Sequence, residues 1–324
     1  MLILADARHI PLRDGCVQCV VTSPPYWGLR DYHVKGQIGK EQTPEQYVTD
    51  LANVFDEVRR VLRPDGTCFV NIGDSYQNAK GQAHGFDPKQ PARRHGLRPQ
   101  DVSVPGLKPK DLVGIPWLFA FEARRRGWYL RSDIIWAKPN PIPESVTDRP
   151  TKSHEYLFLL AKSSSYYYDA QAIAEPVSAS MLQEMEQGYD GLGLKDYEAA
   201  GVQNPSSVKA RIIANARRRR KGGSDKRGFG DDPFTRNKRT VWTINTQPYS
   251  GAHFATMPEK LVEPCIMAGS RPGDLVFDPF LGSGTVGAVA ERLGRRWVGT
   301  DLSYQHLAKK RTAQRGLRFE EARA

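Results

Sequence analysis

Short apolar runs, rich in Val, Ile, Leu and aromatic residues, predict β-strands near both ends of the chain and in its middle. Turn-forming residues bound each run, which favours strands over longer helices. The predicted strands are Leu2–Leu4, Cys16–Thr22, Thr67–Ile72, Tyr129–Trp136, Glu155–Leu160, Leu275–Phe277 and Trp297–Gly299.

Apolar residues at helical spacing predict the helices between these strands. The clearest case has apolar positions at Tyr47, Leu51, Val54, Phe55, Val58 and Leu62. This run stops at Arg63-Pro64-Asp65-Gly66, a sequence typical of a turn. Further helices are predicted over Asp111–Arg126, Pro258–Ala268 and Thr285–Leu293, and from Ser303 onward.

Two stretches interrupt this regular pattern. Residues 81–110 contain five Pro and four Gly, and periodicity fades from about 170 to 245. The alternation of strands and helices elsewhere predicts an α/β sheet built from both chain ends. We therefore expect one half of the sheet from 1–169, with an insertion at about 78–110, and the other half from 246–324. Residues 170–245 would form a separate region between the two halves.

Composition excludes several classes of protein. The 324 residues include 39% hydrophobic residues, but no apolar run reaches the roughly 18 residues that a membrane span requires. No charged-then-apolar leader opens the chain, so we expect a cytoplasmic protein without membrane contact. The four cysteines form no disulfide framework, which indicates a reducing compartment. Cys16-x-x-Cys19 supplies only half of a zinc site, so we predict no metal.

Positive charge is concentrated in one segment. Residues 205–240 contain 12 Lys and Arg against 3 Asp and Glu, whereas the rest of the chain has 35 against 33. Such a segment indicates either a contact with a polyanion or a solvated loop. The candidate phosphate ligands are Arg217, Arg218, Arg219, Arg220, Lys221, Lys226, Arg227, Arg236, Lys238 and Arg239. A second, weaker candidate set is Arg93, Arg94, His95, Arg98, Lys108 and Lys110.

A glycine-rich motif follows the predicted strand Leu275–Phe277. Its sequence is Asp278-Pro279-Phe280-Leu281-Gly282-Ser283-Gly284-Thr285, and glycines at this bend let the backbone approach a ligand closely. Asp301 ends the next strand, where its carboxylate could bind ribose hydroxyls. Gly282-x-Gly284-x-x-Gly287 also satisfies the dinucleotide fingerprint, so a nicotinamide or flavin enzyme is a competing interpretation.

A second motif, Val21-Thr22-Ser23-Pro24-Pro25-Tyr26, ends the predicted strand Cys16–Thr22. The exocyclic amino nitrogen of a base is a poor nucleophile because its lone pair is delocalised into the ring. Two fixed acceptors on its hydrogens can localise that pair, and the Ser23 hydroxyl and the Pro24 carbonyl provide them. Pro25 helps to fix the backbone direction, and Tyr26 offers a face on which a flipped base can stack.

Together the two motifs resemble those of the DNA amino-methyltransferases. Asp278-Pro279-Phe280 is similar to the S-adenosylmethionine loop of that family, and 21–26 match the signature of its N4-cytosine members. Adenine-N6 members usually carry Asp or Asn at the position of Ser23. The catalytic motif precedes the cofactor motif, which is the permuted order of the beta group. The resemblance does not cover 78–110 or 170–245, where the family's target-reading elements vary.

The resemblance implies a Rossmann-like methyltransferase sheet in circularly permuted order, with 170–245 as target-recognition region. It implies that Asp278 and its loop hold the methionine part of the cofactor, and that Asp6 lies near the adenine. It also implies that the segment from His253 to Leu261 closes the methionine end. The expected cofactor-binding residues are Asp6, Phe254, Thr256, Asp278, Phe280, Gly282, Gly284, Thr285 and Asp301.

We therefore predict a site-specific DNA methyltransferase that transfers a methyl group from S-adenosylmethionine to cytosine N4 in a flipped base. Its catalytic residues would be Ser23, Pro24, Pro25 and Tyr26, and its partner double-stranded DNA, with a cognate restriction endonuclease acting separately. Transfer to adenine N6 is the main alternative, and a DNA-specificity protein without catalysis is a remote one. Carbon-5 transfer needs a thiolate nucleophile, but Pro264-Cys265 falls inside a predicted helix, where Cys265 is a small buried residue.

Overall fold

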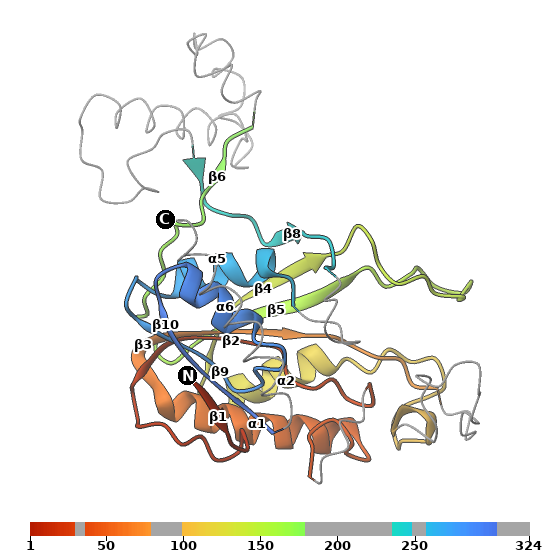
Figure 1. The fold of residues 1–324 in the computed structure, drawn as a ribbon. Helices are drawn as coiled ribbons and strands as arrows, with labels where there is room; N and C mark the ends of the chain where they lie inside the picture. The colour runs from red at the N-terminus through yellow and green to blue at the C-terminus, as the bar shows by residue number, and fades with distance from the viewer. Residues whose placement is uncertain (30–35, 79–98, 179–234, 248–256, 303–324) are drawn as a thin grey trace, which may run out of the picture. The chain divides into compact units, whose positions relative to one another are not determined.

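The computed structural model describes residues 1–29, 36–78, 99–178, 235–247 and 257–302 (Figure 1). The chain divides into two compact units, Met1–Tyr168 with Thr240–Ala324, and Asp169–Arg239. The predicted helix from Ser303 and the second basic set up to Arg98 lie outside the described residues. Within the described part, no helix is long and apolar enough to cross a membrane.

The first unit contains an eight-stranded sheet among its described residues. The strands follow the order β1 (Leu2–Leu4), β10 (Arg296–Asp301), β9 (Leu275–Asp278), β2 (Val17–Thr22), β3 (Leu62–Ile72), β5 (His154–Ala161), β4 (Tyr129–Ala137) and β8 (Val241–Thr243). The first five strands run parallel to one another, and β5 is antiparallel to both β3 and β4. The predicted α/β sheet built from both chain ends is confirmed.

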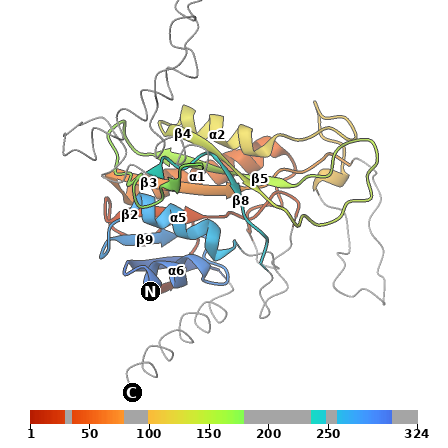
Figure 2. The same cartoon turned by 90° about the horizontal axis from the view of Figure 1, so that it is seen from above.

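Helices cover both faces of this sheet. Figures 1 and 2 show α1 (Pro44–Val61) and α2 (Ile115–Arg125) on one face, with α5 (Glu259–Gly269) and α6 (Thr285–Arg292) on the other. A short 3-10 helix, η1 (Pro99–Asp101), completes the set of described helices. Because parallel strands of this kind are covered on both faces, all 6 residues of β2 are buried, including the polar Gln18 and Thr22.

Successive residues of the central strands pack against different helices. Val20 and Val70 join the large core cluster that contains the inner faces of α1 and α2. Cys19 and Phe69 point the other way, toward α5, where a Cβ added at Gly269 would lie 2.6 Å from the Cys19 sulfur. The helix α5 therefore packs directly against the sheet at this point, and a larger residue at 269 would push it away.

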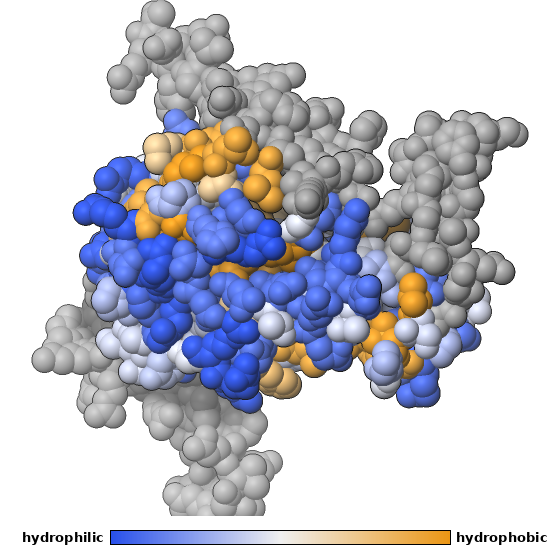
Figure 3. Space-filling view, turned by 90° about the horizontal axis from the view of Figure 1, so that it is seen from below, coloured by the Kyte–Doolittle hydropathy of each residue, from blue (hydrophilic) through white to orange (hydrophobic). Residues whose placement is uncertain are grey.

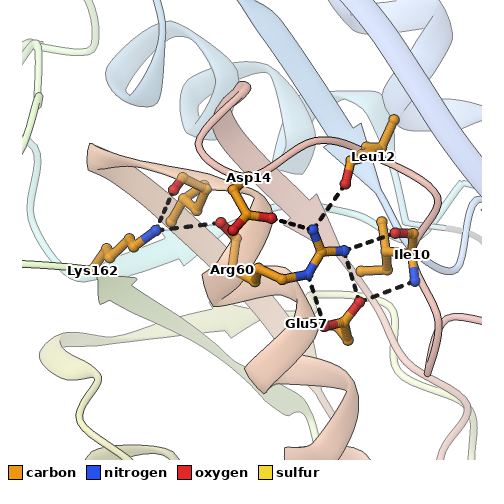
Figure 4. A network of polar contacts seen from close by, with 7 residues as sticks. Ile10, Leu12, Asp14, Glu57, Arg60 and Lys162 are labelled. Carbon is orange, nitrogen blue, oxygen red and sulfur yellow. Dashed lines mark hydrogen bonds and ion pairs between the residues drawn. The ribbon is translucent and has the colours of Figure 1, made fainter.

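A network around Arg60 fastens the segment between β1 and β2 to the last turn of α1 (Figure 4). The guanidinium donates to the carbonyl oxygens of Ile10 and Leu12, and it pairs with Asp14 and Glu57. These interactions raise the pKa of Arg60 and lower that of Glu57. The network holds the chain where it enters β2, the strand that leads to Ser23.

The outer side of the α1 layer is mainly hydrophilic, with apolar side chains gathered at its margins (Figure 3). This follows from α1 itself, whose apolar residues are buried while Glu45, Gln46 and Thr49 are exposed. An amphipathic helix of this kind gains its stability by burying one face.

Three elements differ from the sequence predictions. The helix predicted from Asp111 begins at Ile115, because Gly114 has a left-handed φ of 84° and the Asp74 carboxylate accepts hydrogen bonds from the Gly114 and Ile115 amides. The turn predicted at 63–66 is extended and belongs to β3. The stretch predicted to be irregular up to residue 245 contains β8, which pairs with β4.

The second unit has a two-stranded sheet of β6 (Glu175–Pro176) and β7 (Thr235–Arg236) among its described residues. Three of the predicted phosphate ligands, Arg236, Lys238 and Arg239, lie here, and two of them pair with one carboxylate. Glu175 accepts hydrogen bonds from Arg236 at 3.1 Å and from Arg239 at 2.5 Å. Lys238 lies close enough to lower the pKa of Glu175 further. The basic run 217–221 lies outside the described residues.

Candidate active site

The two sequence motifs meet where β2 and β9 pair at the centre of the sheet. The register joins Cys19 to Val276 and Val20 to Phe277, so both parallel strands end at the same edge. Their connecting helices, α1 after β2 and α6 after β9, lie on opposite faces (Figure 1). In an open α/β sheet, this change of direction creates a crevice at the carboxyl ends of the strands, where ligands bind.

A buried hydrogen bond fixes the two motifs to each other. The Thr22 hydroxyl donates to the Asp278 carboxylate at 2.6 Å, although the two residues are 256 positions apart in the chain. The same carboxylate oxygen accepts from the Phe280 amide at 3.0 Å. Asp278 therefore holds the first turn of the glycine loop in register with the turn that follows Thr22.

Burial raises the pKa of Asp278 to about 7. The nearby Asp301 carboxylate adds to this effect, while the Thr22 and Phe280 hydrogen bonds oppose it. A carboxyl group with this pKa changes its charge close to neutral pH, and its side chain is only 2% exposed. A cation placed in the crevice would therefore favour the ionised form of the Asp278 carboxyl group.

A cavity of about 130 Å³, open to solvent, occupies this edge of the sheet. Both motifs contribute to its lining, as do the residues that follow β1 and β10. The lining residues are Ala5, Asp6, Ala7, Ser23, Pro25, Gly36, Gln37, Ile38, Pro279, Phe280, Gly282, Asp301 and Leu302.

Four of the predicted cofactor residues line the cavity: Asp6, Phe280, Gly282 and Asp301. Asp278, Gly284 and Thr285 lie behind it, in the buried part of the loop and the first turn of α6. Phe254 and Thr256 lie outside the described residues. The structure thus brings the two acidic strand ends and the glycine loop together around one space.

The glycine loop needs its glycines for backbone conformation and for close packing. Gly282 and Gly284 have positive φ values of 52° and 81°, in the left-handed region that other residues avoid. The Gly282 amide donates to the Asp301 carboxylate at 2.9 Å. A Cβ at Gly299 would lie 2.7 Å from Leu281, so β10 can approach the loop only with glycine there. These contacts present Asp301 at the cavity wall.

Asp6 stands at the other side of the cavity, after β1. Its carboxylate forms a bidentate ion pair with Arg8 and also accepts from the Arg8 amide at 2.9 Å. Hydrogen bonds from Arg8 lower the pKa of Asp6. The group is therefore ionised at neutral pH and accepts hydrogen bonds, which suits an amino group or hydroxyls on a ligand.

The turn at 23–26 is held from several sides. The Tyr47 hydroxyl donates to the Pro25 carbonyl at 2.8 Å, and Gly39 packs against the Tyr26 carbonyl. The Tyr26 ring lies over Gly73, where a Cβ would come within 2.5 Å of it. Of the predicted catalytic residues, Ser23 and Pro25 reach the cavity, whereas Pro24 is buried behind it.

Three residues of the site were missed by sequence reasoning. Asn71 at the end of β3 donates to the Tyr26 hydroxyl, and Glu155 of β5 accepts from it at 2.6 Å. Lys138, after β4, forms an ion pair with Glu155. Nothing in the spacing of Lys138 and Glu155 along the sequence linked them to Tyr26. Only the antiparallel pairing of β4, β5 and β3 brings them together.

The described residues contain no cluster of three or more His, Cys, Asp or Glu side chains suited to a metal ion. Cys265 is fully buried in α5, as expected, and its thiol donates to the Leu261 carbonyl at 3.2 Å. It therefore lies in the core rather than at the cavity, which agrees with rejecting a thiolate mechanism.

Comparisons with known proteins agree with this geometry. The family model described as DNA methylase, for N6 and N4 enzymes, matches residues 17–311. The type II methyltransferase M.Cfr9I of Citrobacter freundii is 44% identical over 304 residues, which cover 94% of this chain and 82% of that protein. M.SmaI of Serratia marcescens is 44% identical over 318 residues, covering 97% of this chain and 91% of that protein.

Two solved structures show the same fold. The PvuII DNA methyltransferase (cytosine-N4-specific) has a TM-score of 0.58 at 18% identity, covering 96% of this chain and 85% of its own. A Thermus thermophilus protein described as a putative DNA modification methylase, in complex with S-adenosyl-L-methionine, has a TM-score of 0.55 at 22% identity. That match covers 97% of this chain and 93% of the other. The predicted Rossmann-like fold is confirmed.

Because the pKa of Asp278 is raised, we predict that Asp278→Asn stabilises the cofactor-free protein relative to the wild type, and that this gain in stability grows from pH 4 to pH 7. In this interval the folded state keeps a proton that an unfolded carboxyl with the ordinary pKa of 3.8 has lost, so wild-type stability falls as pH rises. Asparagine does not titrate. At about 1.4 kcal/mol for each pH unit of difference, the gap reaches a few kcal/mol by pH 7 and is constant above it.

Urea denaturation of both proteins at several pH values between 4 and 8.5 measures this gap. Asp50→Asn, at a half-buried position of α1, controls for the general effect of removing one carboxylate. A gap between wild type and Asp278→Asn that stays the same over the whole range would contradict the raised pKa.

Proposed function

Because the chain belongs to the DNA methylase family, we propose that it methylates the exocyclic N4 of cytosine in double-stranded DNA. The coarser activity, that of a type II DNA methyltransferase dependent on S-adenosylmethionine, follows from the family and from the curated relatives. The choice of cytosine N4 rests on one observation. Ser23, rather than an acidic or amide side chain, stands at the cavity wall beside the glycine loop.

The cavity residues fit S-adenosylmethionine. Asp301 and Asp6 provide carboxylates at the cavity wall for ribose hydroxyls and for the adenine end, and Phe280 provides an apolar surface. The amides of the glycine loop would hold the methionine part, and Asp278, buried behind the cavity, would hold that loop in place through the Phe280 amide. The bound cofactor supplies an electrophilic methyl group on a sulfonium sulfur, and the protein supplies position and hydrogen bonds.

The turn at 23–26 activates the amino group in this proposal. The Ser23 hydroxyl oxygen and the Pro24 carbonyl oxygen accept the two amino hydrogens of a cytosine that has left the helix. Holding both hydrogens localises the nitrogen lone pair and directs it at the methyl carbon. The bound cofactor would supply the methyl group with loss of its carbon–sulfur bond, and the proton lost from the amino group would pass to solvent through the open cavity. The Tyr47 hydroxyl keeps the turn in place by its bond to Pro25.

Residues 170–245 would read the DNA target. The basic run Arg217, Arg218, Arg219, Arg220 and Lys221 would bind phosphates, together with Arg236, Lys238 and Arg239. The inserted region lies between the two motifs in the chain, so a single unit could hold the duplex while the sheet holds the flipped base. A cognate restriction endonuclease would act on the same site separately.

The product identifies the function. The protein should be incubated with DNA and isotopically labelled S-adenosylmethionine, and the DNA digested to nucleosides for mass spectrometry. We expect labelled N4-methylcytosine. N6-methyladenine as the labelled product would assign the adenine activity instead, and DNA binding without any labelled nucleoside would indicate a specificity protein.

Ser23→Ala is expected to abolish methyl transfer, by at least roughly 100-fold in a single-turnover assay, while the cofactor dissociation constant changes less than about twofold. The variant loses one of two fixed acceptors that act on the reacting group. Ser103→Ala, at an exposed position away from the cavity, is the matched control and should transfer at the wild-type rate. Equal losses of transfer and of cofactor binding in Ser23→Ala would remove the role assigned to Ser23.

Neutralising Arg218 and Arg219 to Gln should weaken binding to every DNA sequence and lower the salt slope of log Kd. Each phosphate contact contributes about 0.9 to that slope, so the expected decrease is about 2. Neutralising Arg124 and Arg125 in α2 removes the same charge from another exposed surface and should leave the slope in place. A slope unchanged in the first variant would move the phosphate contact elsewhere.

A further inference from the structure

A chain of polar side chains lies behind Ser23 and ends on a carboxylate. The Ser23 hydroxyl lies 3.4 Å from the Tyr26 hydroxyl, and the Tyr26 hydroxyl lies 2.6 Å from Glu155. The Asn71 side-chain amide reaches both the Tyr26 oxygen, at 2.9 Å, and Glu155, at 2.8 Å. The chain therefore connects the cavity wall to a group inside the protein that the methyl transfer itself does not use.

Glu155 is surrounded by charged groups from three other segments. Lys138, after β4, forms an ion pair with it, and the side chains of both residues are 16% exposed. Lys152, before β5, faces both Glu155 and the Asp74 carboxylate after β3. Two cations and the Tyr26 hydroxyl therefore lie around the Glu155 carboxylate.

The donors and acceptors in this chain can be arranged in one way while Glu155 is ionised. A carboxylate only accepts, so the Asn71 atom that faces it is the amide nitrogen, and Tyr26 must use its single hydrogen on Glu155. The Tyr26 oxygen then only accepts, from Asn71 and from Ser23. Ser23 consequently turns its hydrogen inward, and its lone pairs face the cavity.

Burial and the neighbouring Glu155 raise the pKa of Tyr26 well above its ordinary value. The phenol therefore keeps its hydrogen at any pH at which the protein works. The direction of the hydrogen bonds that link Ser23, Tyr26 and Glu155 therefore depends only on whether Glu155 carries a proton. A protonated Glu155 could donate to Tyr26, which would release the Tyr26 hydrogen toward Ser23 and turn the Ser23 hydrogen toward the cavity.

We propose that Glu155, held by Lys138 and Asn71, is a positioning residue that makes Ser23 a hydrogen-bond acceptor toward the amino group of the base. It acts through Tyr26 and does not touch the substrate. The inference rests on the proposed function, because an acceptor at Ser23 is useful only for a ligand that presents amino hydrogens. It gives the Tyr26 hydroxyl a task distinct from the stacking surface of its ring.

The proposal predicts that methyl transfer depends on the Glu155 carboxylate. In a single-turnover assay at neutral pH, Glu155→Gln should be slower than the wild type by roughly tenfold or more, the loss expected for one charge-assisted hydrogen bond. Lys138→Met removes the cation that holds the Glu155 carboxylate by an ion pair, so it should also be slower than the wild type.

Tyr26→Phe keeps the ring and removes the hydroxyl, so it should be slowed as much as Glu155→Gln. The double variant should be no slower than the slower single variant, because both changes break the same chain. Glu122→Gln is the matched control: its carboxylate also forms ion pairs, with Arg125 and Arg126 at the end of α2, and this variant should transfer at the wild-type rate. Cofactor dissociation constants close to that of the wild type would show that each variant is folded.

The outcomes separate this inference from the proposed function. Wild-type protein that transfers no methyl group to cytosine contradicts the proposed function and this inference with it. An active wild type together with a Glu155→Gln variant of similar rate at every pH contradicts the inference alone. So does a Lys138→Met variant that transfers at the wild-type rate, or a double variant in which the two losses multiply.

Discussion

The hydrogen bond between Thr22 and Asp278 joins the two ends of this chain at the one place where the chemistry needs them together. It exists because β2 and β9 are neighbours in the sheet, although almost the whole chain separates them. Each strand carries its own motif past its carboxyl end, and the helices that follow leave on opposite faces. A crevice opens between them without any residue having to be strained into it.

The other features of the site support that junction. Burial raises the pKa of Asp278, and the hydrogen bonds that its carboxylate accepts from the Thr22 hydroxyl and the Phe280 amide oppose this rise. The glycine loop can then present Asp301 to the cavity. On the other side, the antiparallel strands β4 and β5 extend the sheet and bring a carboxylate behind Tyr26. The cofactor side is thus built by parallel strands and the amino-group side is supported by antiparallel ones.

Local patterns were sufficient to predict the α/β class, the central strands and the residues on the two loops. Ser23, Gly282 and Asp301 stand at strand ends, and the ends of parallel strands meet at one edge of a sheet. The pairing of Glu155 with Tyr26 was beyond such reasoning, because it depends on which strands are neighbours and in which register. The same is true of β8, a run of three residues that becomes a strand only against β4. The early start predicted for α2 failed because a cap from Asp74, distant in sequence, decides where that helix begins.

The central claim is that Ser23 accepts a hydrogen bond from the amino group of a flipped cytosine while the glycine loop holds the cofactor. A crystal structure of the protein with a non-reactive cofactor analogue and an oligonucleotide containing its site measures this directly. We predict an extrahelical cytosine whose N4 lies within hydrogen-bond distance of both the Ser23 hydroxyl oxygen and the Pro24 carbonyl oxygen. A flipped adenine at this position, or a cytosine whose amino group contacts neither atom, would contradict the account.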